Sequence, residues 1–253
     1  MSRRSARRLT AAALAAVGLT GLLVACGDGS DDGIDYLVDA RISSYNVNTV
    51  DGAASGAVMA LSRVLPGFSL VGSDGQIMMD RDLGSVTVEE GPALTVRYQF
   101  SEHAVYSDGA PMVCDDLLLA ATALGGHAKG FAPATTAGYR DIDSVDCTPG
   151  EQTATVTFRR GRDYTAWRAL FGPGTLLPAH VIGKLAGVPD VAAAINDGDR
   201  AKLAKIAEAW NTGLTLAPGD EIDPEVFVAS GPYRIDGYTV ENGLQLVAND
   251  QWW

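Results

Sequence analysis

Apolar and polar positions along the chain predict both strands and helices. Residues 95–100 and 153–158 alternate strictly between the two kinds of side chain, which is typical of strands with one buried face. The segment from about 114 to 124 is mostly apolar and predicts a helix between these strands. Residues 199–210 repeat apolar positions at helical spacing, with Asp199 in the N-cap position, and predict a second helix.

Shorter apolar runs predict further elements. The Ala-rich segment 53–65 has roughly helical spacing and ends at Pro66-Gly67. Turn sequences between paired apolar runs predict two hairpins, 68–71 with 77–79 and 231–235 with 244–247, and residues 34–38 predict a short strand. Because the strands occur in hairpins and do not alternate regularly with helices, we expect a mixed α/β (α+β) class.

The first 25 residues have the pattern of an export signal. A basic start is followed by an apolar run at 9–24, which is short for a membrane span of about 20 residues. The run ends in Leu23-Val24-Ala25-Cys26, which favours a bacterial lipoprotein signal with lipidation at Cys26. A plain export signal and a membrane anchor are the alternatives. Residues 26–33, rich in Gly and Asp, then predict a flexible tether to a lipid-anchored domain.

The charge of the remaining chain is strongly acidic. The whole sequence has 19 Lys and Arg against 31 Asp and Glu, for a net charge of −12. Four arginines lie in the predicted signal, so about −16 remains after its removal. Nucleic acid is therefore not expected as a partner, because phosphate binding requires clustered basic side chains.

Cysteine usage predicts a disulfide. With Cys26 lipidated, Cys114 and Cys147 remain, and an exported protein with two remaining cysteines most simply pairs them. Metal ligation is the alternative, but the chain has no CxxC or HxxxH spacing that would support it.

Residues 103–120, His-Ala-Val-Tyr-Ser-Asp-Gly-Ala-Pro-Met-Val-Cys-Asp-Asp-Leu-Leu-Leu-Ala, are the strongest candidate for catalytic chemistry. Asp115 and Asp116 are adjacent, and paired carboxylates can act as an acid and a base. However, both lie at the start of the predicted helix, where carboxylates interact favourably with the helix dipole. Neighbouring helical residues also point about 100° apart, so we expect these two carboxylates not to converge on one substrate atom.

Other motifs of catalysis and cofactor binding are missing from the sequence. His103, His127 and His180 lie in different segments without a histidine three or four residues away. There is no GxSxG, GxGxxG or GxxxxGK[ST] motif. We therefore expect neither an enzyme nor a metal or cofactor site.

Four segments together form a recognisable pattern. They are Asp74-Gly75-Gln76-Ile77, the stretch 96–116 with Ser107-Asp108-Gly109-Ala110-Pro111, the segment Ser230-Gly231-Pro232-Tyr233, and residues 246–253. In this order they resemble the family 5 extracellular solute-binding proteins of ABC importers, the peptide- and nickel-type binding lipoproteins. Tyr106 stands where the family commonly has Trp.

The resemblance implies a bilobal periplasmic-binding-protein fold of type II. Mapped by motif order, 34–70 and 176–253 would form part of the first lobe and 71–175 an inserted domain. Family members are roughly twice as long, so the resemblance implies that the second lobe lies beyond Trp253 and is absent from this chain.

The resemblance also implies a function in binding without reaction. We expect a solute-binding component of an ABC importer that takes oligopeptides or another small solute. It would deliver them to permease subunits from the outer face of the cytoplasmic membrane. The loop residues Tyr45, Asn46, Asn48 and Thr49 match the position where the family's first strand reaches the ligand cleft. The alternatives are a loop that caps its own turn, and an envelope scaffold or glycolipid-binding lipoprotein with the same fold.

Overall fold

The computed structural model describes residues 41–89 and 91–253. The predicted signal at 1–25, lipidation at Cys26, the tether at 26–33 and the strand at 34–38 therefore lie outside the described residues. Within the described part of the chain, strands and helices are mixed and every paired strand is antiparallel, as predicted.

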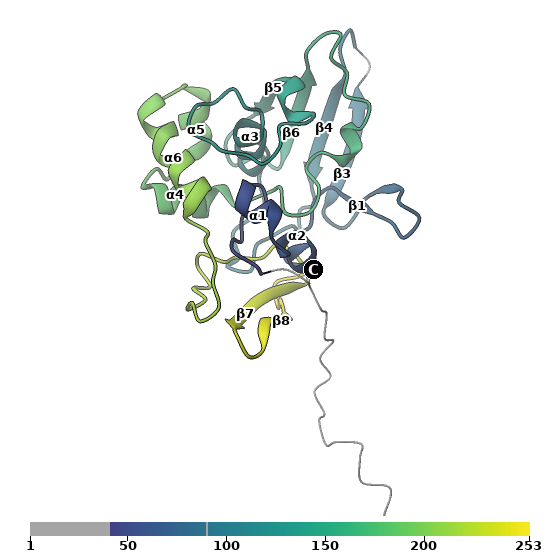
Figure 1. Cartoon of the computed structure of the whole chain (residues 1–253). Helices are drawn as coiled ribbons and strands as arrows, with labels where there is room; N and C mark the ends of the chain where they lie inside the picture. The colour runs from purple at the N-terminus through teal and green to yellow at the C-terminus, as the bar shows by residue number, and fades with distance from the viewer. Residues whose placement is uncertain (1–40, 90) are drawn as a thin grey trace, which may run out of the picture. The chain divides into compact units, whose positions relative to one another are not determined.

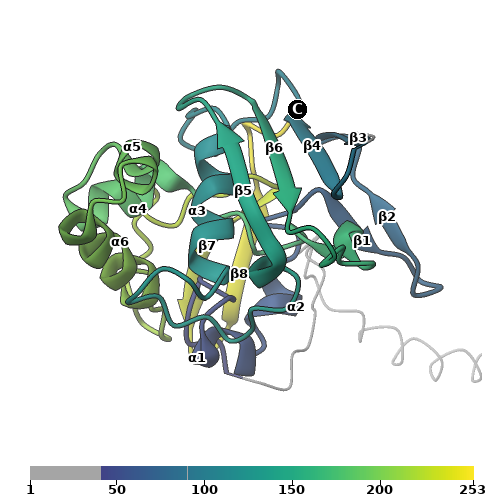
Figure 2. The same cartoon turned by 90° about the horizontal axis from the view of Figure 1, so that it is seen from above.

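A four-stranded antiparallel sheet occupies the middle of the chain. Its strands are β3 (Gly84–Glu89), β4 (Thr95–Phe100), β5 (Ile142–Cys147) and β6 (Thr153–Phe158), in the spatial order β3-β4-β6-β5 (Figure 2). The predicted strands β4 and β6 are confirmed, and they pair with Val96 opposite Val156. Alternate side chains of both strands are buried, among them Tyr98 and Phe158, because one face of the sheet lies in the core.

Four helices lie beside this sheet. The predicted helix α3 (Cys114–Leu124) is confirmed and contacts β5 and β6. Helices α4 (Ala179–Ala186), α5 (Val191–Asn196) and α6 (Arg200–Thr212) lie on the side of α3 away from the sheet (Figure 2). Asp199 is the N-cap of α6, as predicted, and its Oδ1 accepts hydrogen bonds from the backbone of Ala201 and Lys202, each at 3.1 Å.

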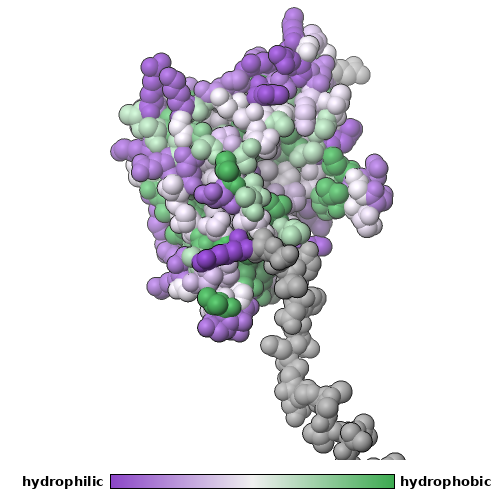
Figure 3. All heavy atoms as spheres, viewed as in Figure 1, coloured by the Kyte–Doolittle hydropathy of each residue, from purple (hydrophilic) through white to green (hydrophobic). Residues whose placement is uncertain are grey.

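Both predicted hairpins are confirmed. Strands β1 (Ser69–Val71) and β2 (Ile77–Met79) are joined by a turn in which Gly75 has a φ of 78°, a conformation that favours glycine. This hairpin, at the right of Figure 3, exposes four apolar side chains, Leu70, Val71, Ile77 and Met78. Strands β7 (Tyr233–Thr239) and β8 (Gly243–Ala248) form the other hairpin, drawn in yellow in Figure 1.

The helix predicted at 53–65 is wrong in extent. Two short helices occupy this region, α1 (Val50–Ala54) and α2 (Ala57–Leu61). They are separated at Ser55, whose backbone is extended and whose Oγ accepts a hydrogen bond from Ala57 N–H, so the chain starts a second helix there. Val58, one of the apolar residues of this segment, is exposed.

A continuous apolar core connects these elements. Phe68, which precedes β1, packs against Tyr98 of β4 with ring centroids 5.1 Å apart, and Phe171 packs against the other side of Tyr98. Two 3₁₀ helices, η1 (Tyr139–Asp141) and η2 (Trp167–Ala169), contribute further aromatic side chains to the core. The predicted domain boundaries near 70 and 175 stay a prediction. Among the residues that the structure describes, each helix is too short or too polar to cross a membrane.

Candidate functional site

An open groove of about 470 Å³ runs along helix α1. Its volume is within the range of ligand sites, which usually measure a few hundred Å³ or more. Most of its lining residues are of polar types, and two side chains of opposite charge, Arg41 and Asp51, contribute to it. The other lining residues are Ser43, Ser44, Thr49, Val50, Ala54, Ser55, Ala132, Asn211 and Thr215.

The walls of the groove are joined by backbone hydrogen bonds. Tyr45 N–H donates to Leu214 O at 2.8 Å and Leu216 N–H donates to Ser43 O at 3.1 Å, which pairs the segment before α1 with the segment after α6. The side chain of Asn211 fixes the lining segment around Ala132. Its Oδ1 accepts from Ala132 N–H at 3.0 Å, and its Nδ2 donates to Gly130 O at 2.8 Å. The groove is therefore preformed in the chain.

The four residues predicted to bind ligand lie beside the groove and are buried. Tyr45 donates its hydroxyl hydrogen to Val228 O at 2.6 Å, and Asn46 Nδ2 donates to Trp210 O at 2.7 Å. Asn46 Oδ1 accepts from Asn48 at both the backbone N–H and the side-chain amide.

The remaining polar groups of this loop are also used within the chain. Asn48 Nδ2 donates to Gly174 O at 2.8 Å, and Thr49 caps α1 by accepting from Gly52 N–H at 3.1 Å. These contacts are those of a loop that caps its own turn, the alternative named above. Of the four residues, Thr49 alone lines the groove, and a ligand-binding role for the set stays a prediction.

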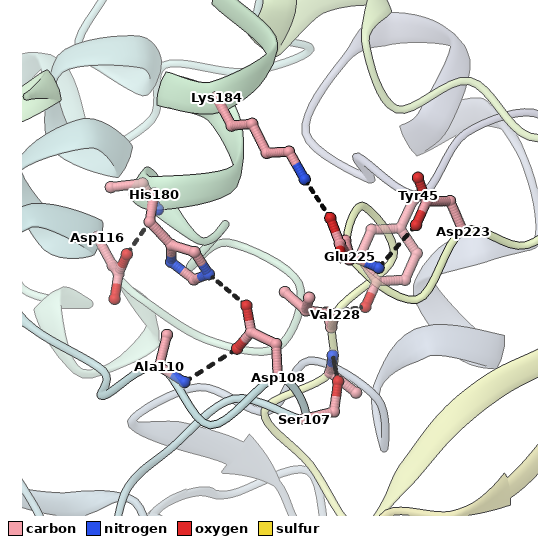
Figure 4. Close-up of polar contacts among 12 residues, drawn as sticks. Tyr45, Ser107, Asp108, Ala110, Asp116, His180, Lys184, Asp223, Glu225 and Val228 are labelled. Carbon is pink, nitrogen blue, oxygen red and sulfur yellow. Dashed lines mark hydrogen bonds and ion pairs between the residues drawn. The ribbon is translucent and has the colours of Figure 1, made fainter. Parts of the chain in front are cut away.

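The segment 103–120 forms a second polar cluster, shown in Figure 4. Asp108 Oδ1 accepts from Ala110 N–H at 3.0 Å, which closes the predicted turn. Asp108 Oδ2 lies 2.9 Å from His180 Nε2, at the start of α4. Ser107 and Ala229 exchange two hydrogen bonds, from Ser107 N–H to Ala229 O at 2.7 Å and from Ala229 N–H to Ser107 Oγ at 3.0 Å.

Asp116 is buried beneath this turn with 1% of its surface exposed. Its Oδ2 accepts from Val113 N–H at 3.1 Å and its Oδ1 accepts from Ala179 N–H at 2.7 Å. Burial raises the pKa of Asp116 to about 6, although these two hydrogen bonds and the nearby His180 and Tyr106 lower it in part. The carboxylate therefore joins the start of α3 to the start of α4.

Asp115 points to different partners, as the helix geometry predicts. Its Oδ1 accepts from Gly150 N–H at 2.9 Å, in the turn between β5 and β6. The two carboxylates share no partner, so they do not form an acid and base pair around one atom.

Cys114 and Cys147 form the predicted disulfide, with an S–S distance of 1.99 Å. It connects the start of α3 to the end of β5. Asp115 lies near both sulfur atoms, and this is the only set of three metal-binding side chains that the described residues bring together. Because both thiols are consumed in the disulfide, the alternative of metal ligation by these cysteines is wrong for this state.

The histidines are not gathered at one site. His103 lies 3.5 Å from Glu102, His127 contacts the backbone of Arg140, and His180 pairs with Asp108. Of the groove residues, Thr49 was named from the sequence. The others, such as Asn211 and Thr215, were not identified, because they come from segments that carry no motif.

Comparisons with known proteins find relatives among lipoproteins and a likeness to an oligopeptide-binding protein. It is 42% identical over 261 residues to an uncharacterized lipoprotein of Mycobacterium tuberculosis, with 100% of this chain and 46% of that protein covered. It is 26% identical over 212 residues to the oligopeptide-binding protein OppA of the same organism, with 83% of this chain and 31% of that protein covered. The chain thus spans about half of the length of the curated relatives it matches first. No family model matches the chain.

Solved structures of other proteins have a similar fold over most of this chain. A periplasmic EDTA-binding protein, EppA, matches with a TM-score of 0.65 at 24% identity, covering 85% of this chain and 35% of that one. OppA of Haemophilus influenzae, in complex with the peptide RPPGFSPFR, matches with a TM-score of 0.58 at 16% identity, covering 85% and 37%. Both are binding proteins by title, and at these identities the likeness shows a shared fold.

Proposed function

We propose that this chain, which has the fold of the extracellular solute-binding proteins, binds oligopeptides as part of an ABC import system. The likeness to oligopeptide-binding protein OppA over 83% of the chain carries this proposal. The same fold in a peptide complex of another OppA supports it. The resemblance read from the four sequence motifs points to the same class of protein.

The groove along α1 is our candidate for one side of the peptide site. Asn211 Nδ2 keeps a second hydrogen, and the hydroxyl oxygens of Ser43 and Ser55 keep acceptor lone pairs, so these groups can still hydrogen-bond a peptide backbone. The opening of the groove accepts a ligand without unfolding any described element, and bridging waters can complete hydrogen bonds to varied side chains. Such a surface tolerates many peptide sequences, which suits uptake of mixed peptides.

The proposed location is the cell envelope, outside the cytoplasm. The relatives named as lipoproteins and the solved structure titled periplasmic support this location. We further propose lipidation at Cys26 as the anchor to the outer face of the cytoplasmic membrane, and permease subunits of the importer as the partners. Capture at this face would raise the local concentration of peptide at the permease.

Peptide binding with groove variants tests the proposal. Sequencing the DNA downstream of the Trp253 codon first decides the longest form that the gene encodes, and that form is used. Ala54→Trp places a large side chain in the groove, whereas Met59→Trp places one on an exposed surface of α2 that does not line it. By calorimetry with a mixture of short peptides, we expect binding in the wild type and Met59→Trp but not in Ala54→Trp. Equal binding by both variants would place the peptide site elsewhere.

One observation favours a second candidate function. The chain is 42% identical to the uncharacterized lipoprotein but 26% identical to OppA, so it is nearer to a group without a stated ligand. An envelope lipoprotein that binds a glycolipid, or that acts as a scaffold, would fit the same fold. The ligand distinguishes the two functions, because copurified peptides support import and an acyl or glycan ligand supports the alternative.

A further inference from the structure

The turn at 106–110 is held on two sides by segments that are distant in the sequence. On one side, the reciprocal hydrogen bonds between Ser107 and Ala229 attach the turn to the segment that leads into β7. On the other side, Asp108 reaches His180 on the first turn of α4 (Figure 4). The turn therefore couples the region around α3 to two parts of the chain that come 70 or more residues later.

His180 is placed between two carboxyl groups. Its Nε2 lies 2.9 Å from Asp108 Oδ2, and its ring lies on Tyr106, with ring centroids 5.3 Å apart. The buried Asp116 is near enough to interact with its charge and also faces the Tyr106 phenol. His180 is therefore paired directly with Asp108, and the buried Asp116 belongs to the same cluster.

The other charged groups near His180 are one cation and two carboxylates. Lys184, one turn further along α4, pairs with Glu225, and Asp223 is the next nearest acid. Loss of the proton from His180 therefore leaves Asp108 and Asp116 without their closest positive charge. Histidine is also the side chain that ordinarily changes charge between pH 5 and 8.

We propose that Asp108 and His180 form a pH-dependent latch, which holds the 106–110 turn against α4 and against the segment 228–230. The latch is tight while His180 carries a proton and weaker once that proton is lost. A neutral imidazole can still donate a hydrogen bond to Asp108, so the latch loosens at high pH without opening fully. The latch is inferred from the contacts of Asp108 with His180 and of Ser107 with Ala229, and it does not depend on the proposed peptide binding.

Amide hydrogen exchange at Ser107 and Ala229 reports the latch directly. A hydrogen bond to a charged group is about twice as strong as one between neutral groups, so we expect the protection factors of both amides to fall about three- to five-fold from pH 6 to pH 8. Protection factors are corrected for the intrinsic effect of pH. The amide of Val156 in the central strand β6 serves as the internal reference, because it follows the stability of the whole sheet.

Two variants and one matched control decide the outcome. His180→Gln keeps a donor for Asp108 but does not titrate. In this variant the protection factors of the Ser107 and Ala229 amides should therefore no longer fall from pH 6 to pH 8. His103→Gln removes an exposed histidine that also lies beside a carboxylate, and it should behave like the wild type. Asp108→Asn removes the partner's charge, and it supplies the same test if His180→Gln does not fold.

The proposal is overturned if the fall in protection persists in both His180→Gln and Asp108→Asn. It is also overturned if Val156 shows the same fall as Ser107 and Ala229, because the effect would then belong to global stability.

Discussion

Removing the Cys114–Cys147 disulfide should strongly destabilise the chain. The two cysteines are 33 positions apart, so the bond closes a loop of about that length in the unfolded state. The chain-entropy relation for such a loop gives about 3.5–4 kcal/mol of stabilisation at 25 °C. Since domains are usually stable by about 5–15 kcal/mol, this bond would supply a large share of the total.

Urea unfolding of the double variant Cys114→Ala/Cys147→Ala tests this magnitude. Alanine is suitable because both side chains are buried, and the change leaves no free thiol. We expect a loss of about 3–4 kcal/mol, which corresponds to about 6–16 °C in Tm for a chain of this size. Wild-type protein that is reduced and alkylated serves as a second reference. A loss below about 1 kcal/mol would refute the reasoning, because the loop would then be ordered without the bond.

Other predictions concern buried polar groups. Because the pKa of Asp116 is raised from 3.8 to about 6, its contribution to stability should fall by up to about 3 kcal/mol as pH rises from about 4 to about 6, and level off above. Urea unfolding at a series of pH values measures how the free energy of unfolding changes with pH. Asp116→Asn should remove this pH dependence, and an unchanged pH dependence would mean that other groups cause it. Asn46→Ala removes the donor to Trp210 O and should lower the free energy of unfolding by about 2–4 kcal/mol, whereas near-neutral stability would mean that water replaces the amide. Tyr45→Phe leaves Val228 O without its donor and should lower the free energy of unfolding by about 1–2 kcal/mol in urea. No loss of stability would speak against this hydrogen bond.

The sequence predicts best those elements whose periodicity reports burial. Strands β4 and β6 alternate because one face of each lies in the core, and the structure confirms their bounds at 95–100 and 153–158. Strand β3 was not predicted, although Val86 and Val88 alternate with polar residues in it, and most of its residues are exposed. The disulfide was predictable because two cysteines remained in a chain with a predicted export signal.

Local capping chemistry explains the error at α1 and α2. The apolar spacing of 53–65 favours one helix, but Ser55 bonds to its neighbours' backbone and Gly56 follows it, so the helix is interrupted. Apolar spacing alone does not register this competition, because the interruption depends on a single hydroxyl group.

The candidate sites were only partly predictable because they depend on tertiary contacts. The position of Asp116 in the first turn of α3 follows from the sequence, but its hydrogen bond to Ala179, 63 residues away, does not. The polar loop at 45–49 suggested ligand binding, which stays a prediction, and the contacts of its side chains with the backbone of distant segments could not be read from the sequence. The groove beside it combines three segments, and no local pattern marks Asn211 as part of it.

Native mass spectrometry of the protein, purified from its export compartment in the longest form that the gene encodes, tests the central claim most directly. Peptide import predicts a series of bound masses that fragmentation identifies as short peptides of mixed sequence, and Ala54→Trp should reduce their occupancy. A single acyl or glycan ligand, or protein without any ligand that also fails to bind added peptides, would contradict the proposed function.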